Sequence, residues 1–298
     1  MKTDRSDRLP ERAHAMKLKV NWFVPPPLSL ISKARGFDQA RGLEVLATVT
    51  TGSDAQFEAL CAGEADAVVT AMDNVLMWNR RGRIEDIRIV AQIEAATGFI
   101  LVARADAGRV EDLVGSDLLV DSAENGFAIA LRALLHDAGI PAEAYRMIVV
   151  GGVRERFGAF KAGRGQATLL ATFVEDAAVQ AGFHTLARID TLFPGMPGQG
   201  LAVRTGAMAR AEPAIRAWLG AMDEARAWAS ENPGPARAIV EETGVPAPVV
   251  DTLLAGIPDS FQPRNAEIFQ DQRRRLGLPG ADGGIEMLVD DRLFRTLA

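Results

Sequence analysis

The stretch that decides the fold reads GFDQARGLEV (residues 36–45), TTGSDAQFEALCAGEADAVVT (50–70) and AMDNVLMWNRRG (71–82). Residues 43–50 form an apolar, β-branched run that closes on Thr51-Gly52-Ser53-Asp54, a turn whose Ser or Asp can cap a helix. A second apolar run, 67–70, ends in Met72-Asp73-Asn74, where another capping pair opens another helix. Two helix N-termini therefore point out of the same edge of a predicted parallel sheet. Open α/β folds bind small polar ligands at that edge.

The alternation of strand and helix signals continues to about residue 204. Further β-like runs lie at 18–24, 87–93, 98–104, 118–121, 147–150, 167–171 and 200–204. Helical stripes follow several of these runs, and one of them contains Phe127, Leu131 and Leu134 and stops at Gly139. After residue 204 the chain becomes predominantly helical. We therefore predict an α/β protein with two βα-rich halves and a helical C-terminal tail.

Composition indicates an ordinary globular protein. Of the 298 residues, 48% are hydrophobic and 24% are charged, which is typical of a folded enzyme or binding protein. A net charge of -6 argues against nucleic-acid binding, which needs a basic face. The short run Arg273-Arg274-Arg275 is expected to be the solvated side of a late helix. We expect no membrane insertion, since no window is long and apolar enough to span a bilayer.

Cys61 is the only cysteine, which excludes an intrachain disulfide and a multi-cysteine metal site. Because Cys61 shares a helical face with Phe57 and Leu60, we expect a core residue and not a reactive thiol. The sequence shows no glycine-rich nucleotide loop and no cluster of metal ligands. We therefore expect no cofactor and no metal.

The N-terminal segment lacks the features of an export signal. Residues 1–15 read MKTDRSDRLPERAHA, with charges every two or three residues where a secretory leader needs a continuous apolar stretch. We expect a disordered tail over 1–15. The sequence as given thus indicates a cytoplasmic protein, or a periplasmic one if a leader precedes it.

Many short matches in register make this chain resemble a known family: the solute-binding proteins of ABC transporters for nitrate, sulfonate, taurine and thiamine-pyrimidine precursors. The matches run from about residue 16 to 204, and only the helical character of the tail is similar. The matching residues are Gly36-Phe37, Gly42-Leu43-Glu44-Val45, Ala59-Leu60, Ala62-Gly63-Glu64-Ala65-Asp66, Leu101-Val102-Ala103-Arg104, Asp112-Leu113-Val114-Gly115, the Asp121-to-Phe127 turn, Gly151-Gly152, Ala162-Gly163, Ala167-Thr168 and Gly182-Phe183.

The resemblance implies the two-lobe type II periplasmic-binding-protein fold, each lobe a mainly parallel sheet flanked by helices. By this analogy lobe one comprises residues 16–102 plus 200–298, and lobe two residues 103–199. The crossings then fall at Val102-Ala103 and Gly200-Leu201. Such hinges permit closure around a ligand in the cleft between the lobes. The resemblance also implies an ABC permease as partner.

Candidate ligand residues lie in the turns at the carboxyl ends of predicted strands. On lobe one they are two aromatic and four polar side chains: Trp22, Phe23, Thr51, Ser53, Asp73 and Asn74. Trp22 or Phe23 would supply a flat apolar wall, with core packing as the alternative for Trp22. The polar side chains can contact a ligand or cap a helix, and one residue can do both.

On lobe two the candidates are Ser122, Asn125, Phe127, Arg154 and Thr172. Phe127 also fits the helix stripe, which favours core packing. Arg154 and Arg156 follow Gly151-Gly152 in the first turn of a helix. A positive charge is unfavourable there, because it lies at the positive end of the helix dipole, so its presence requires an explanation. An anionic ligand group is one reason, and Arg154, nearer the strand end, is the preferred contact. Pairing with Glu155, Glu124 or Asp121 is the alternative.

An enzyme on the same fold is the competing hypothesis: a lyase, decarboxylase or desulfinase-like protein acting on a small aromatic or carboxylate substrate. The desulfinase-like enzymes use a cysteine in the first loop, near the place that Trp22 occupies here. No histidine has a partner at catalytic spacing, so we interpret all three as surface residues: His14, His136 and His184. A carboxylate-based lyase stays open, using Asp73, Glu94 or Asp121. We favour a non-catalytic binding protein for a small anionic or heteroaromatic molecule.

Overall fold

The computed structural model describes residues 15–282, 284 and 286–293, so the expected tail over 1–15 lies almost wholly outside the described residues. Within these described residues, ten strands form two five-stranded sheets. The first sheet contains β1 (Met16–Trp22), β2 (Leu43–Val49), β3 (Ala67–Ala71), β4 (Ile87–Gln92) and β10 (Gln199–Arg204). The second sheet contains β5 (Phe99–Ala103), β6 (Asp117–Val120), β7 (Arg146–Val149), β8 (Ala167–Ala171) and β9 (His184–Arg188). Every predicted strand is present.

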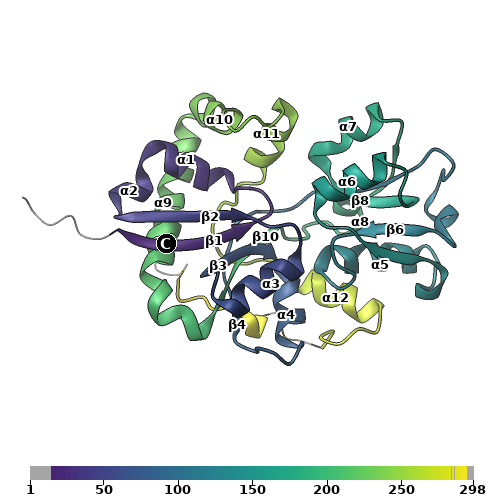
Figure 1. Ribbon diagram of the computed structural model, residues 1–298, viewed down its shortest axis with the longest axis horizontal. Coiled ribbons are helices and arrows are strands. Elements are labelled where there is room, and N and C mark those ends of the chain that lie inside the picture. The colour runs from purple at the N-terminus through teal and green to yellow at the C-terminus, as the bar shows by residue number, and fades with distance from the viewer. Residues whose placement is uncertain (1–14, 283, 285, 294–298) are drawn as a thin grey trace, which may run out of the picture.

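The two sheets have the same topology, one in each lobe (Figure 1). Their strand orders are β2-β1-β3-β10-β4 and β7-β6-β8-β5-β9. Strands β10 and β5 run antiparallel to both of their neighbours, whereas the remaining pairs are parallel. In each sheet the antiparallel strand is the first one after a crossing between lobes. The two-lobe architecture with mainly parallel sheets is confirmed.

Helices flank both sheets. Those that follow strands of lobe one are α1 (Pro27–Arg35), α2 (Phe37–Ala40), α3 (Ser53–Ala62) and α4 (Asp73–Asn79). Lobe two has α5 (Gly126–Asp137), α6 (Val153–Lys161), α7 (Glu175–Gln180) and α8 (Ile189–Leu192), with a 3-10 turn at Thr172–Val174. The tail supplies α9 (Thr205–Glu231), α10 (Pro233–Glu241), α11 (Ala247–Ala255) and α12 (Glu267–Arg275).

The chain crosses between the lobes in residues 93–98 and 193–198. The first crossing lies ahead of the expected Val102-Ala103, because β5 pairs with β8 and β9 of the second sheet and its first residue, Phe99, already lies opposite Ala171. The second crossing ends just before the expected Gly200. Strand pairing therefore places 99–103 with lobe two.

Helix α9 covers one face of the first sheet. Its Trp218 is buried and stacks on Trp22, with ring centroids 6.3 Å apart, and it donates from Nε1 to Ser29 Oγ at 3.4 Å. Trp22 is thus a core residue, which was the alternative to ligand contact for this side chain.

Cys61 is half-buried and packs against the core, and burial raises the pKa of its thiol. Among the residues described, no helix is long and apolar enough to cross a membrane.

Helix α12 departs from the rest of the tail and lies between α4 and α5 (Figure 1). Its Phe269 belongs to a hydrophobic cluster that includes Phe57 and Trp78 of lobe one and Leu131 of lobe two. Part of the segment assigned to lobe one from the sequence is therefore packed against lobe two. The apolar core runs without interruption from one lobe to the other at this point.

The expectation that Arg273-Arg274-Arg275 is solvated is wrong for Arg273. Its side chain is 1% exposed and grips Asp73, which is 0% exposed, with Nε–Oδ1 at 2.7 Å and Nη2–Oδ2 at 2.5 Å. Arg275, on the same helix, pairs with Asp137 of α5 at 2.8 Å. Helix α12 thus forms one ion pair with each lobe. The helical stripe alone did not reveal this, because Asp73 is distant in sequence.

We expect Asp73→Asn to lower the free energy of unfolding by about 3–5 kcal/mol, because the substitution leaves the Arg273 guanidinium buried without its counterion. Asp54→Asn is the matched control. Its ion pair with Arg81 is solvent-exposed, so the loss should stay below about 1 kcal/mol. Urea unfolding of the three proteins measures both values. Equal, small losses would show that the buried pair contributes nothing.

Candidate functional site

The strand-to-helix turns of the two lobes meet at the carboxyl ends of the parallel strands. Gly152, before α6, donates from its backbone N–H to the Thr51 carbonyl at 2.9 Å. Gly126, at the start of α5, donates to Asn74 Oδ1 at 3.3 Å. A Cβ added at Gly126 would lie 2.9 Å from the Asp73 Cβ, so this approach requires glycine. The lobes are therefore in direct contact around the candidate site.

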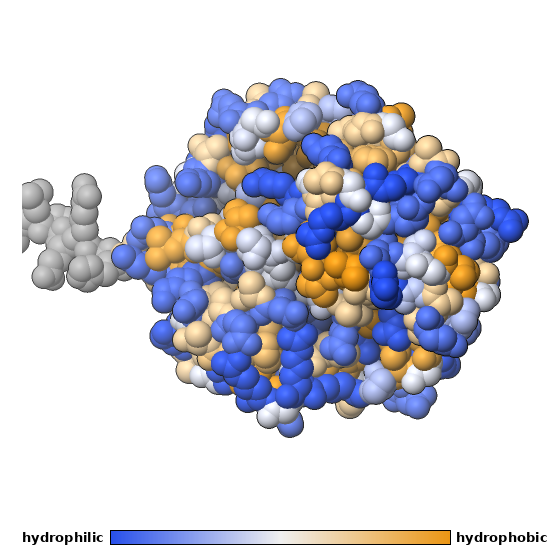
Figure 2. All heavy atoms as spheres, turned by 45° about the vertical axis from the view of Figure 1, so that its right-hand side comes forward, coloured by the Kyte–Doolittle hydropathy of each residue, from blue (hydrophilic) through white to orange (hydrophobic). Residues whose placement is uncertain are grey.

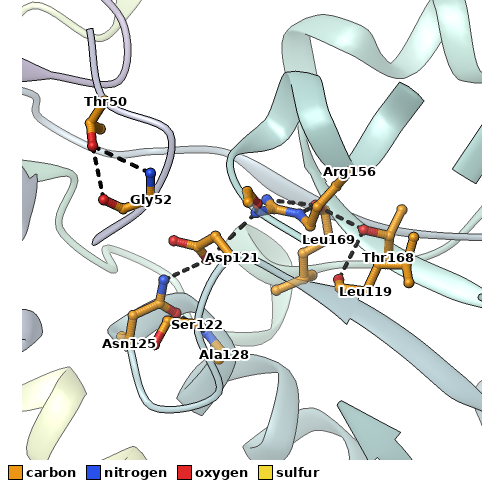
Figure 3. Close-up of polar contacts among 12 residues, drawn as sticks. Thr50, Gly52, Leu119, Asp121, Ser122, Asn125, Ala128, Arg156, Thr168 and Leu169 are labelled. Atoms are coloured by element: carbon orange, nitrogen blue, oxygen red, sulfur yellow. Dashed lines mark hydrogen bonds and ion pairs between the residues drawn. The ribbon is translucent and has the colours of Figure 1, made fainter. Parts of the chain in front are cut away.

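Asp121 and Arg156 form the central polar pair on lobe two (Figure 3). Their side chains are 10% and 5% exposed, and Arg156 Nη1 lies 3.5 Å from Asp121 Oδ1. Arg156 also donates from Nη1 to Gly151 O at 2.7 Å and from Nε and Nη2 to Leu169 O at 3.1 and 3.0 Å. Burial lowers the pKa of Arg156 and raises the pKa of Asp121. The charge of each side chain acts in the opposite direction on the pKa of its partner. Arg156 thus has its donors engaged within lobe two.

A third charged group, Glu94, lies in the first crossing. Its Oε2 accepts from the Gln199 backbone N–H at 3.3 Å, from Gln199 Nε2 at 3.2 Å and from the Thr97 hydroxyl. Burial raises the pKa of Glu94 above its ordinary value. The sequence pointed to Glu94 only as a possible lyase carboxylate. Gln199 was missed, since nothing in its sequence surroundings shows that its side chain is half-buried beside Glu94.

The lobe-one candidates lie in different environments. Phe23 faces lobe two, since a Cβ added at Gly152 would lie 3.5 Å from its ring. Thr51 is exposed and contributes its carbonyl to the contact between lobes. Asn74 is buried and donates to Thr70 Oγ1 at 2.8 Å. Asp73 points to Arg273 and is fully engaged there. Ligand contact by Phe23, Thr51 and Asn74 stays a prediction.

The expected side-chain caps on lobe one are wrong. Ser53 is buried as the first residue of α3, whose N-cap is Gly52, and Met72 holds the N-cap of α4; neither cap residue makes a side-chain capping hydrogen bond. On lobe two Asn125 does cap α5, because its Oδ1 accepts from the Ala128 N–H at 2.8 Å. Asn125 also donates from Nδ2 to Asp121 at 2.6 Å, which orients that carboxylate.

The remaining lobe-two candidates are buried or half-buried. Phe127 packs on Phe99 with ring centroids 4.2 Å apart, as core packing predicts. Ser122 is buried and accepts from the Glu124 N–H at 3.4 Å. Thr172 donates from its backbone N–H to Gly98 O at 3.0 Å, beside the first crossing.

Arg154 and Arg156 lie on opposite faces of α6. Arg154 is exposed on α6, whereas Arg156 is buried against Asp121. The reason is helical rotation: α6 begins at Val153, so a residue one turn later returns to the face that contacts the strand ends. The pairing with Asp121 that was considered as the alternative is present for Arg156. An anion contact by Arg154 stays a prediction.

The histidines do not join the site. His136 is exposed beside Asp137, with Nδ1 3.6 Å from Oδ1, and His184 Nε2 lies 2.7 Å from the Ala107 carbonyl. His14 lies outside the described residues. Over the described ranges, no group of three or more His, Cys, Asp or Glu side chains is placed to hold a metal ion.

Comparison with known proteins gives one family and several solved structures. The profile of the family described as NMT1/THI5 like matches residues 29–236. The alkanesulfonate-binding protein SsuA from Xanthomonas axonopodis pv. citri, bound to MOPS, is similar with TM-score 0.72, 18% identity and coverage of 96% of this chain and 98% of that one. The periplasmic nitrate-binding protein NrtA from Synechocystis PCC 6803 is similar with TM-score 0.76, 15% identity and coverage of 95% and 88%.

The desulfurization enzyme DSZB is also similar, with TM-score 0.62, 14% identity and coverage of 95% of this chain and 98% of that one. No curated protein matches this chain. At such identities these structures show a shared fold. The expected type II periplasmic-binding-protein fold is thereby confirmed.

We expect Arg156→Gln to lower the free energy of unfolding by about 3 kcal/mol, because it leaves Asp121 and two carbonyl groups without their buried donor. Arg154→Gln is the matched control on the same helix and should stay within about 0.5 kcal/mol, since its side chain is exposed. Chemical denaturation measures both. A larger loss for the Arg154 variant would reverse the assignment of the two arginines.

Proposed function

The chain belongs to the NMT1/THI5-like family, and from this premise we propose that it is a solute-binding protein of ABC-importer type that holds one small molecule between its lobes. The proposal rests on one observation: the turns that follow the parallel strands of one lobe contact the turns that follow the parallel strands of the other. The contacts from Gly152 to Thr51 and from Gly126 to Asn74 join turns of opposite lobes directly. Two crossing segments connect the lobes, which suits a hinge that closes over a ligand.

The charges near the site favour binding over catalysis. Asp73 and Asp121 each lie beside a buried arginine, which leaves neither carboxylate free to remove a proton from a substrate. Cys61 packs against the core from α3 and does not lie in the first loop, where the desulfinase-like enzymes carry their nucleophile. A lyase that uses Glu94 is the second candidate function, because burial raises the pKa of that carboxyl toward the range of a general base.

The proposed ligand is a small anionic or heteroaromatic molecule. The similar proteins named above are an alkanesulfonate-binding protein and a nitrate-binding protein, and both of those ligands are small anions. The proposed partner is an ABC permease with its ATPase, which would place the working protein outside the cytoplasmic membrane. Differential contacts of the ligand with both lobes would stabilise the closed arrangement.

The test identifies the ligand and asks what happens to it. Native mass spectrometry of protein purified under mild conditions should show one small molecule bound per chain. Adding that molecule to stripped protein should reduce the radius of gyration in small-angle X-ray scattering, and the molecule should be recovered unchanged after incubation. Recovery of a chemically converted product would favour the lyase instead.

We expect Gly126→Ala to weaken binding of the recovered ligand by about tenfold or more, because the new methyl group overpacks the contact with Asp73 at a typical cost of about 1–3 kcal/mol. Gly158→Ala on α6 is the control, since an added Cβ meets no atom within 4 Å there. The control should leave the Kd unchanged and stabilise the helix slightly. Titration calorimetry provides both constants, and equal Kd values for the two variants would contradict closure through Gly126.

A further inference from the structure

The buried cations of the described chain have their donors engaged within the protein. They are Arg156 and Arg273. Arg156 pairs with Asp121 and donates to two backbone carbonyls. Arg273 binds Asp73 through two nitrogens and Pro279 O through the third, at 3.0 Å. Each arginine therefore lies beside one carboxylate, and the positive charge near the site is already compensated.

Glu94 has no such partner. Its three hydrogen bonds, from Thr97 Oγ1 and from the backbone and side-chain nitrogens of Gln199, all end on Oε2. Within the described part of the chain, no ion pair includes Glu94 and no hydrogen bond reaches its Oε1. Glu94 is half-buried, and a carboxylate taken partly out of water without a cation is costly, so its unbonded oxygen is available to a donor.

Gln199 adds a second open acceptor at the same place. Its Oε1 is buried and has no hydrogen-bond partner. Turning the amide over does not help, because Nε2 must face Glu94 Oε2 in order to donate to it at 3.2 Å. The carboxylate therefore fixes the amide with its oxygen directed away from Oε2. Buried acceptors of this kind cost about 1–3 kcal/mol each when they stay unpaired.

Both groups belong to the segments that connect the lobes. Glu94 lies in the 93–98 crossing, and Gln199 follows the 193–198 crossing as the first residue of β10. Gly198 packs against the Glu94 stem, since a Cβ there would lie 2.8 Å from Cγ. Thr172 of lobe two bonds Gly98 in the first crossing. The acceptor pair thus lies where both lobes and both hinge segments come together.

Resting on the proposed binding function, we infer that the ligand presents a hydrogen-bond donor group, an ammonium or amidinium nitrogen, to Glu94 Oε1 and Gln199 Oε1. Such a group supplies donors to both open acceptors and a counterion to the carboxylate. The inference assigns Glu94 and Gln199 as specificity-determining residues. It is compatible with a heteroaromatic ligand that has a basic nitrogen, or with a zwitterion whose anionic end lies elsewhere.

Three probes of the same planar shape test the inference: benzamidine, benzamide and benzoate. Titration calorimetry of the ligand-free protein should show benzamidine binding at least about tenfold more tightly than benzoate, which is the scale of one charge-assisted hydrogen bond. Benzamide should fall between them. Glu94→Gln should abolish the preference, whereas Glu58→Gln, an exposed carboxylate on α3, should keep it. Benzoate binding as well as benzamidine, or no binding of benzamidine at millimolar concentration, overturns the inference.

The pH dependence separates a binding role from a structural one. Because burial raises the pKa of Glu94, the carboxyl becomes charged only as the pH rises through that raised value. Benzamidine affinity should therefore increase with pH over that window in the wild type and stay flat in Glu94→Gln. The stability of the ligand-free wild type should change in the opposite direction, because a group with a raised folded pKa loses its stabilising contribution as the pH rises.

Thermal unfolding provides the independent readout. Above the Glu94 pKa, Glu94→Gln should unfold at the same temperature as the wild type or a higher one, since it removes a half-buried charge that has no cation beside it. A variant that unfolds at a clearly lower temperature shows a structural network and overturns the inference. The proposed function is judged separately, by closure around the molecule recovered by native mass spectrometry. Closure with that molecule but no benzamidine preference would reject only the ligand class.

Discussion

The buried ion pair between Asp73 and Arg273 is the interaction on which the arrangement of the two lobes depends. Both side chains are essentially inaccessible to water, so each charge is tolerable only while the other is in place. The pair fixes α12 against α4, and α12 then reaches lobe two through Phe269 and through Arg275 with Asp137. A helix that follows lobe one in sequence is thereby part of the contact between lobes, and any hinge motion has to move it with one lobe or the other.

The same constraint, that a buried charge needs a partner of opposite charge, governs the electrostatics of the region where the two lobes meet. Each buried arginine has a carboxylate beside it, and the backbone carbonyls of Gly151, Leu169 and Pro279 take up the remaining donors. This arrangement rigidifies the strand ends, since moving either arginine would leave several groups unpaired. Glu94 differs because its neighbours, Thr97 and Gln199, are neutral. The uncompensated charge therefore lies on the segments that connect the two lobes.

The fold alone does not separate a receptor from an enzyme. Binding proteins and a desulfurization enzyme share this architecture, with TM-scores of 0.72 and 0.76 for the former and 0.62 for the latter, so the distinction rests on the side chains where the lobes meet. Here the polar groups are occupied in holding the lobes and in orienting one another, as Asn125 does for Asp121. That pattern is typical of a site that binds a molecule without transforming it.

The sequence by itself determined the strands, the two α/β halves and the helical tail, because periodicity and turn residues act over a few positions and need no knowledge of distant contacts. It also placed Phe127 in the core from its stripe. It did not determine which arginine faces the site, since Arg154 and Arg156 are two residues apart and therefore lie on opposite faces of α6, one exposed and one buried. It did not pair Asp73 with Arg273, because the two residues are 200 positions apart. Nor did it mark Gln199, whose open acceptor exists only because the two crossing segments lie side by side. Only the tertiary structure decided these points, since the free energy of a buried charge or amide depends on the partners that the fold brings to it.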